Sequence, residues 1–308
     1  MQNENTSFFC DRTYSELMEE WNAQKEIPNT NKSYRILLTG DIHSTDLETW
    51  YGWPDEKRMQ HFVDHVLAEH AIRPFDAILV LGDISLDYHD CKTPYDKGYS
   101  TGQDFLQRFF SQLPQDIPHF ILAGNHEQFS YEDWLALTGN ERQGTVVIGE
   151  NTFVMLDNYA EDLGPVYDSS DKYSLIDTAY IKEQIEKYPH NRVFLCSHAF
   201  ELEKESEAFL QLLREESRIK GLFMGHSHLC GVIALGEEYQ NLTIAQIGNF
   251  SYSDDENNRK DTFWGIRDLI IEGDRAVSRY ILAESDAEVF GEQIHVEKRE
   301  VDVCEYRL

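Results

Sequence analysis

The sequence predicts an α/β protein, a layered sandwich of strands and helices within a single domain. Short apolar runs alternate with segments of helical periodicity from about residue 34 to residue 225. Five of the apolar runs lead directly into a short polar block. Beyond residue 230, apolar runs follow one another closely with no helical segment between them, which is typical of antiparallel strands. Together these observations favour strand–helix units followed by a β-rich segment.

The first predicted strands are buried and parallel, because an unbroken aliphatic run is typical of a strand covered on both faces. They are residues 34–38, 77–81, 120–122, 193–195 and 222–224. The polar blocks that follow them are Asp41-Ile42-His43, Gly82-Asp83, Gly124-Asn125-His126-Glu127, Ser197-His198 and Gly225-His226-Ser227-His228. Since the carboxyl ends of such strands meet at one sheet edge, we expect these side chains to share a single pocket.

A helix is predicted over residues 55–70, after the first strand. His61 and His65 lie four residues apart and off its apolar stripe, so we expect both to be surface residues. They do not match a zinc-protease helix, because Phe62 stands where that motif needs glutamate. The apolar stripe itself consists of Met59, Phe62, Val63, Val66 and Leu67.

Three further helices are predicted. Asp177 caps one that ends before Pro189, and Gln184 interrupts its apolar face, which indicates a half-exposed helix. A second ends before Gly221, and the third is an amphipathic N-terminal helix expected on the outside of the sheet. The residues that mark these two are Phe209, Leu210 and Leu213, and Tyr14, Leu17, Met18 and Trp21.

The last third of the chain predicts antiparallel strands at residues 232–235, 242–247, 262–271 and 276–282, with a turn at Gly273-Asp274. No linker or repeat interrupts the pattern. We therefore expect one main domain over residues 34–285. A helical extension, residues 1–33, packs on it, and residues 286–308 form a polar extension of the same domain.

Composition limits the partners. The chain has 56 acidic and 27 basic residues, a formal net charge of −29, and no Lys/Arg cluster, so a nucleic-acid partner is disfavoured. No apolar run is long enough to span a membrane, and the N-terminus lacks the pattern of a secretory signal. The five cysteines are scattered without a CxxC pair, which suits reduced thiols. These features predict a cytoplasmic protein.

The convergent side chains are donors that suit divalent transition metals. Carboxylate, imidazole and amide oxygen donors without cysteine point to Mn, Fe or Zn rather than to a thiolate-bound structural zinc. Asp83 is the natural bridge between two ions, because its strand lies between the two groups of ligands. Seven candidates are too many for one ion and suit two: Asp41, His43, Asp83, Asn125, His198, His226 and His228.

Such a pair of ions predicts phosphoester hydrolysis. Two metals roughly 3.5–4 Å apart can polarise a phosphoryl oxygen and lower the pKa of a bridging water, which permits in-line hydroxide attack on phosphorus. His126 is not needed as a ligand and can protonate the leaving oxygen as a general acid.

These motifs, in this order, resemble those of the calcineurin-like metallophosphoesterases over about residues 34–250. The resemblance implies a four-layer αββα sandwich, two mixed sheets flanked by helices, of the metallo-dependent phosphatase kind. It implies two divalent ions, with Mn favoured, and it implies that His126 is the leaving-group acid and that Glu127 helps to position it. The implied ligands are Asp41, His43, Asp83 and His228 for one metal, and Asp83, Asn125, His198 and His226 for the other.

The chain departs from the family pattern in two places. The second block often continues as Gly-Asp-x-x-Asp or Asn, but Leu86 stands at that last position and Asp87 follows it. Ala199 follows His198, so a polar neighbour is absent there. The position of Leu86 is not usually a ligand, so we expect the metal site to be intact and the shape beside it to differ.

Three functions stay under consideration. The first is hydrolysis of a small phosphodiester or phosphomonoester, with the preference between them and the oligomeric state left open. The second is a nuclease of the same family, which the acidic charge disfavours. The third is a non-catalytic scaffold for partner binding, although such relatives usually lose ligands or the acid histidine. A protein phosphatase is also open, although the Asp-Arg-Gly that typically follows Gly-Asp in those enzymes is missing here.

Substrate specificity is expected to come from loops at the strand ends. Their aromatic residues either stack on a base or sugar or fill an apolar gap beside the sheet. Arg58 and Arg267 are candidate phosphate clamps by residue type alone. The aromatic residues are Trp50, Tyr51 and Trp53, and, in the connection 84–103, Tyr88, Tyr95 and Tyr99 together with His89.

Overall fold

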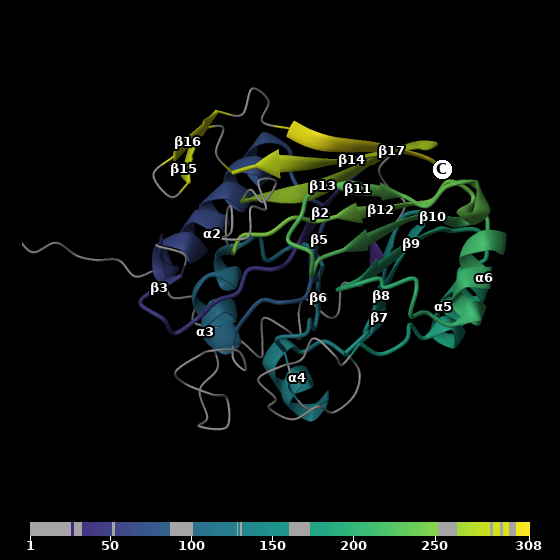
Figure 1. Cartoon of the computed structure of the whole chain (residues 1–308), viewed down its shortest axis with the longest axis horizontal. Coiled ribbons are helices and arrows are strands. Elements are labelled where there is room, and N and C mark those ends of the chain that lie inside the picture. The colour runs from purple at the N-terminus through teal and green to yellow at the C-terminus, as the bar shows by residue number, and fades with distance from the viewer. Residues whose placement is uncertain are drawn as a thin grey trace, which may run out of the picture.

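The computed structural model describes residues 26–27, 33–50, 53–86, 101–127, 129, 131–159, 173–251, 264–283, 286–289, 292–295 and 300–308. Two large sheets lie face to face, with helices on their outer sides (Figure 1). The predicted four-layer αββα sandwich is therefore confirmed. No helix in the described part of the chain is both long and apolar enough to cross a membrane.

The first sheet has six strands and mixed direction. Its parallel part is β2, β5 and β6, and an antiparallel part is added on the other side of β2. The turn predicted at Gly273-Asp274 joins β13 and β14. The strand order is β17 (Glu300–Arg307), β14 (Arg275–Leu282), β13 (Gly265–Glu272), β2 (Ser33–Thr39), β5 (Ala77–Leu81) and β6 (His119–Leu122).

The second sheet has seven strands around the parallel set β8, β9, β10 and β12. The strand order is β1 (Glu26–Ile27), β7 (Gly144–Ile148), β8 (Asn151–Leu156), β9 (Arg192–Ser197), β10 (Ile219–Met224), β12 (Thr243–Gln246) and β11 (Val232–Ala234). Two small hairpins stand apart from both sheets: β3 (Thr49–Trp50) with β4 (Trp53–Pro54), and β15 (Asp286–Val289) with β16 (Glu292–His295).

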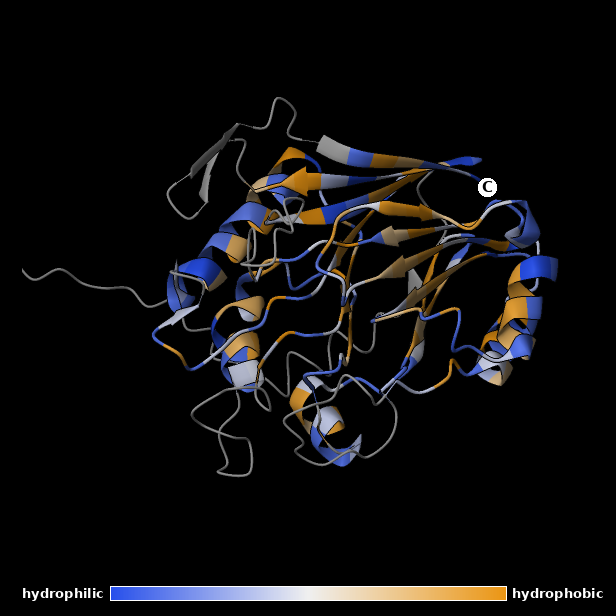
Figure 2. Ribbon diagram, viewed as in Figure 1, coloured by the Kyte–Doolittle hydropathy of each residue, from blue (hydrophilic) through white to orange (hydrophobic). Residues whose placement is uncertain are grey.

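The strands of both sheets carry many hydrophobic residues (orange in Figure 2). Their side chains alternate between the two faces of each sheet and form three apolar clusters that hold the sandwich together. In β2, Leu37 packs toward the helices, whereas Ile36 and Leu38 pack against the second sheet. The helices of the first sheet are α2 (Asp55–Ile72), α3 (Thr101–Arg108), the 3₁₀ turn η2 (Phe110–Gln112) and α4 (Tyr131–Thr138). Those of the second are α5 (Thr178–Lys187), α6 (Glu207–Glu215) and the 3₁₀ turn η3 (Glu237–Tyr239).

Several local predictions need correction. His65 is buried beside the carbonyl of Ile281, and the ring of His61 packs edge-on against Phe250, so neither is the surface residue expected. The face of the helix α2 that packs into the sandwich is therefore wider than its aliphatic stripe and includes these two histidines. Gln184 was expected to interrupt the buried face of α5, but its side chain is buried. The predicted cap of α5 is present, because Asp177 accepts a hydrogen bond from the N–H of Tyr180.

One strand toward the C-terminal end differs from expectation, and a second lies in a segment for which no strand was predicted. The strand β12 was expected to be antiparallel to its neighbours, but it runs parallel to β10 and antiparallel only to β11. The strand β17 lies in the segment predicted as a polar extension and pairs with β14 at the sheet edge. The N-terminal helix predicted around Tyr14 to Trp21 lies outside the described residues.

The buried imidazole of His119 is expected to make the fold sensitive to acid. Burial lowers the pKa of His119 from 6.5 to about 3, so the folded protein keeps it neutral where the unfolded chain takes up a proton. The stability that this adds is lost as the pH falls below 6.5. Between pH 7.5 and 5.0 the loss amounts to ~2 kcal/mol. Urea unfolding at both pH values measures the free energy of unfolding. Its decrease from pH 7.5 to 5.0 should be smaller in His119→Leu than in the parent protein by that amount.

The control is His190→Leu, which removes an exposed imidazole. Its free energy of unfolding should change with pH as that of the parent protein does. Equal pH dependence in His119→Leu and the parent would contradict the assignment.

Candidate metal centre

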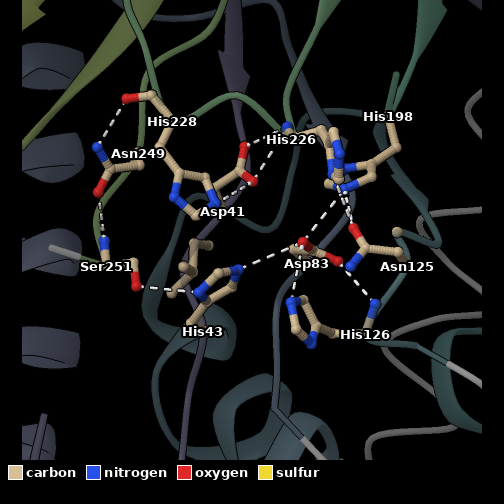
Figure 3. A network of polar contacts seen from close by, with 12 residues as sticks. Asp41, His43, Asp83, Asn125, His126, His198, His226, His228, Asn249 and Ser251 are labelled. Carbon is tan, nitrogen blue, oxygen red and sulfur yellow. Dashed lines mark hydrogen bonds and ion pairs between the residues drawn. The ribbon is translucent and has the colours of Figure 1, made fainter. Parts of the chain in front are cut away.

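Seven polar side chains meet where five strands end. They come from the loops after β2, β5, β6, β9 and β10, and Figure 3 shows Asp83 at the centre, between His43 on one side and His198 on the other. All are buried except His226, which is partly exposed. The structure thus brings together every ligand predicted from the sequence: Asp41, His43, Asp83, Asn125, His198, His226 and His228.

The side chains form two groups that share one carboxylate. In each group the candidate ligand atoms lie within 4.8 Å of one another. One group is Asp41, His43, Asp83 and His228, and the other is Asp83, His198 and His226. Asn125 joins the second group, because its Oδ1 lies 3.0 Å from Nε2 of His198 and 2.9 Å from Nδ1 of His226.

The backbone at these positions is unusual. Left-handed φ angles are costly for residues with a Cβ, at about 1–2 kcal/mol each. Five members of the two groups adopt them, whereas only three other non-glycine residues in the described part of the chain do. The five are Asp41 (49°), His43 (53°), Asp83 (53°), His226 (63°) and His228 (59°). Such strain concentrates at functional sites, where it directs side chains that a relaxed loop would not.

The glycines of the motifs allow the loops to approach one another. A Cβ at Gly124 would lie 2.1 Å from Oδ1 of Asp83, and a Cβ at Gly225 would lie 2.6 Å from Oδ2 of Asp41. Both distances are far inside van der Waals contact, so only glycine fits at these two positions.

The electrostatics of the site keep Asp83 ionised. Burial acts to raise the pKa of its carboxyl, but attraction to His198 and His126 holds that pKa well below its ordinary range. Burial acts to lower the pKa of His198, yet Asp83, 3.1 Å from its Nε2, raises it to about 9. Burial lowers the pKa of His43 and of His226, which favours the neutral imidazole that binds metals.

His126 lies beside the shared carboxylate and is more exposed than that carboxylate. Its side chain is 14 % exposed, compared with 1 % for Asp83, and its Nε2 lies 3.8 Å from Oδ2 of that carboxylate. Its backbone N–H donates to Oδ1 of Asp83, and its ring packs edge-on against His43 at 4.9 Å. A ligand at the shared carboxylate would therefore lie beside this imidazole.

Glu127 links two of the loops through the backbone. Its carboxylate accepts hydrogen bonds from the N–H groups of Asp83 (2.7 Å), Gly124 (2.8 Å) and Ser85 (2.9 Å). Burial and the charge of Asp83 raise the pKa of Glu127 to about 8, against the opposing effect of these N–H groups. The side chain thereby holds the loop that carries His126 against the loop that carries Asp83.

The two arginines proposed as phosphate clamps are structural. Arg58 and Arg267 are both fully buried. Arg58 donates to the backbone carbonyls of Ile42 and His43, and Arg267 to those of Gln246 and Cys230. With their donors bound to main-chain oxygens inside the protein, neither guanidinium faces a substrate, so that prediction is wrong.

The described aromatic residues near the site contact the protein. The indole N–H of Trp50 donates to Ser251, and the ring of Trp53 packs edge-on against Trp264 at 5.0 Å. These contacts favour the packing interpretation of the two tryptophans over base stacking. Leu86 is buried and its N–H donates to the carbonyl of Ser44, so it completes the core beside the loop. Tyr51 and residues 87–100, with Asp87, Tyr88, His89, Tyr95 and Tyr99, lie outside the described residues.

Sequence reasoning missed one part of the site. Asn249 and Ser251 follow β12 and contact the loops that carry His228 and His43. The signal was present, because an apolar run at 242–247 leads into this polar segment just as in the five recognised blocks. The expectation that this strand was antiparallel placed its end at the opposite edge of the sheet.

Comparisons with known proteins agree with this geometry. A family model described as calcineurin-like phosphoesterase matches residues 34–230. No curated protein sequence matches the chain. Among solved structures, a dimetal phosphatase from Danio rerio is 15 % identical, with 82 % of this chain and 96 % of that chain covered and a TM-score of 0.61.

Two further structures share the fold. A purple acid phosphatase from yellow lupin (Lupinus luteus) seeds is 12 % identical with a TM-score of 0.57; the match covers 91 % of this chain but 54 % of that one. GAP50, the anchor in the inner membrane complex of Plasmodium, is 12 % identical, with 87 % of this chain and 90 % of that chain covered and a TM-score of 0.55. The fold therefore occurs in phosphatases and also in a protein described as an anchor.

Proposed function

Because the chain belongs to the calcineurin-like phosphoesterase family, we propose that it is a dimetal-dependent phosphohydrolase acting on a small phosphodiester or phosphomonoester. The observation that carries this proposal is the pair of buried ligand groups joined by Asp83. The family sets the reaction class, phosphoric ester hydrolysis. The two ligand groups in this chain could hold the metal ions that such a reaction uses.

The donor set fits two divalent ions. Asp41, His43 and His228 would hold one, Asn125, His198 and His226 the other, with Asp83 shared. Buried ionised and polar groups are costly unless they are paired or coordinate a metal, and this cluster gathers them in a single pocket. Nitrogen and oxygen donors without thiolate suit Mn, Fe or Zn, and we propose Mn as the native metal.

When bound, the two ions supply polarisation of a phosphoryl oxygen and a water of lowered pKa. The protein's own groups carry the rest. The imidazole of His126, beside the shared carboxylate and partly exposed, protonates the oxygen of the departing alcohol. Glu127 acts as a positioning residue, because it holds the loop of His126 against the loop of Asp83 through their backbone N–H groups.

The acid histidine and the full ligand set argue for a catalyst rather than a scaffold. A chain that keeps the fold only to bind a partner has no need for five strained ligands and a partly exposed imidazole beside the shared carboxylate. The acidic charge of −29 makes a small phosphoester a better substrate than a nucleic acid.

The proposal is tested by a paired rate on protein stripped of metal and reloaded with Mn²⁺. Hydrolysis of bis-p-nitrophenyl phosphate is compared with that of p-nitrophenyl phosphate. We expect Mn-dependent turnover of at least one, absent from the stripped protein, and the ratio assigns the chain to diesters or monoesters. Two bound ions without turnover of either compound would favour the scaffold.

A further inference from the structure

The segment 249–251 contacts two of the three loops that carry the ligands of one proposed ion, namely the loop of Asp41 and His43 and the loop of His228. It follows β12, whose carboxyl end lies at the same edge as that of β10 because the two strands are parallel. We propose that Ser251 is a positioning residue for His43. The segment would thereby fix the arrangement of the ligands around the ion assigned to Asp41, His43, Asp83 and His228. This inference rests on the metal roles proposed above.

The ring of His43 is held at both nitrogens. Its Nε2 faces the site, 3.3 Å from Oδ2 of Asp83, and its Nδ1 lies 3.0 Å from Oγ of Ser251 (Figure 3). An imidazole that binds a metal through Nε2 keeps its proton on Nδ1 and needs an acceptor there. Ser251 is fully buried, so its hydroxyl supplies the acceptor where water is excluded.

Trp50 holds that hydroxyl in place. Its indole N–H, 2.9 Å from Oγ of Ser251, can only donate, so one lone pair of the hydroxyl accepts it. The remaining lone pair is available to the N–H of His43. A hydroxyl that accepts two hydrogen bonds has little freedom to rotate, and the orientation of the ring follows from it.

Asn249 extends the same control to the second loop. Its side-chain Nδ2 donates to the carbonyl of His228 at 3.0 Å, and its Oδ1 accepts from the N–H of Ser251 at 2.9 Å (Figure 3). The N–H of Phe250 donates to the carbonyl of Asp41. One short segment thus contacts two loops that carry three of the ligands, and these loops follow β2 and β10, which are far apart in sequence.

Arg58 anchors this arrangement from the helix α2. Its guanidinium donates to the carbonyls of Phe250 (2.8 Å) and His43 (2.7 Å), and also to that of Ile42. Its charge is balanced by Asp55 at 2.5 Å. The left-handed turn at His43 therefore lies between a buried cation below it and the hydroxyl of Ser251 at its ring.

The test measures metal binding. Metal-free parent protein and Ser251→Ala are titrated with Zn²⁺ by calorimetry, and the ring N–H of His43 is followed by ¹⁵N NMR in the zinc-loaded proteins. We expect Ser251→Ala to bind one ion 10–100-fold more weakly, which is the usual effect of losing such a partner, and the other ion within threefold. The Nδ1 proton, protected in the parent protein, should exchange rapidly in the variant.

Two further variants sharpen the result. Trp50→Phe keeps an aromatic ring but removes the donor, and it should weaken the same ion by on the order of threefold to tenfold. It also decides the question if Ser251→Ala does not fold. Ser278→Ala, a fully buried serine bound to Arg267, is the matched control and should bind both ions as the parent does.

Failure of the proposed dimetal function and failure of the inference about Ser251 give different results. If the parent protein binds fewer than two ions, the proposed dimetal function is wrong, and the inference is wrong with it. If the parent binds two ions and both variants match its affinities, the inference alone is overturned. Equal weakening of both ions would also overturn it, because a general loss of stability does not select one site.

Discussion

Replacing His126 with alanine is expected to lower kcat by on the order of 10²–10⁴-fold, the usual contribution of a general acid. Both ions should stay bound, because the imidazole lies 3.8 Å from the shared carboxylate and outside the two ligand groups. The measurement is kcat of the Mn-loaded variant, with its metal content determined on the same sample.

The leaving group separates acid catalysis from a mere change of shape. A nitrophenolate leaves without protonation, whereas an alkoxide needs a proton in the transition state. We therefore expect His126→Ala to lose far more activity toward an alkyl phosphoester than toward the nitrophenyl ester of the same type. His190→Ala, which removes an exposed imidazole, is the control. An equal loss with both leaving groups would contradict the assignment of His126 as the acid.

Asp83→Asn is expected to have the largest effect on metal binding. The substitution keeps the shape of the side chain but removes the charge shared by both ligand groups. Removing one partner of a buried charged contact costs about 3–5 kcal/mol, equivalent to a weakening of binding on the order of 10²–10⁴-fold. Both ions should be affected, and hydrolysis should fall with them. Calorimetric titration with Zn²⁺ and metal analysis after dialysis measure the loss.

The control is another buried carboxylate. Asp268 is fully buried and pairs with Arg35 and Arg279 rather than with histidines. Asp268→Asn should lower the free energy of unfolding but leave two ions bound. If Asp83→Asn lost only one ion and held the other at parental affinity, Asp83 would be a ligand of a single metal and not the bridge.

The parallel strands and the side chains at their ends could be predicted from the sequence. Buried strands such as β5 are continuous aliphatic runs, and a polar block directly after such a run identifies a sheet edge. The helices α2, α5 and α6 were also recognised, because the spacing of their apolar residues is local. The roles of the predicted ligands and of His126 stay predictions until metals and rates are measured.

Other features were missed or predicted wrongly, since they depend on contacts across the chain. Whether β12 is parallel or antiparallel depends on which strand it pairs with, and so the contribution of Ser251 was not predicted. His65 has the sequence pattern of a surface residue, yet it lies beside Ile281, 216 positions away. Arg58 was read as a phosphate clamp, but its partners are main-chain oxygens that no sequence pattern reveals.

The sequence by itself determined the fold class, the position of the site at the strand ends and the identity of the seven candidate ligands. These follow from short-range patterns, because hydrophobic periodicity and the residues after a strand are local properties. The shared role of Asp83 was also expected from the sequence. Only the tertiary structure decided that Glu127 accepts from the backbone N–H of Asp83, that Arg58 donates to the carbonyl of His43, and that Ser251 faces His43. The hydrogen bond between Ser251 and His43 joins residues 208 positions apart, and such partners are set by how the elements pack in space.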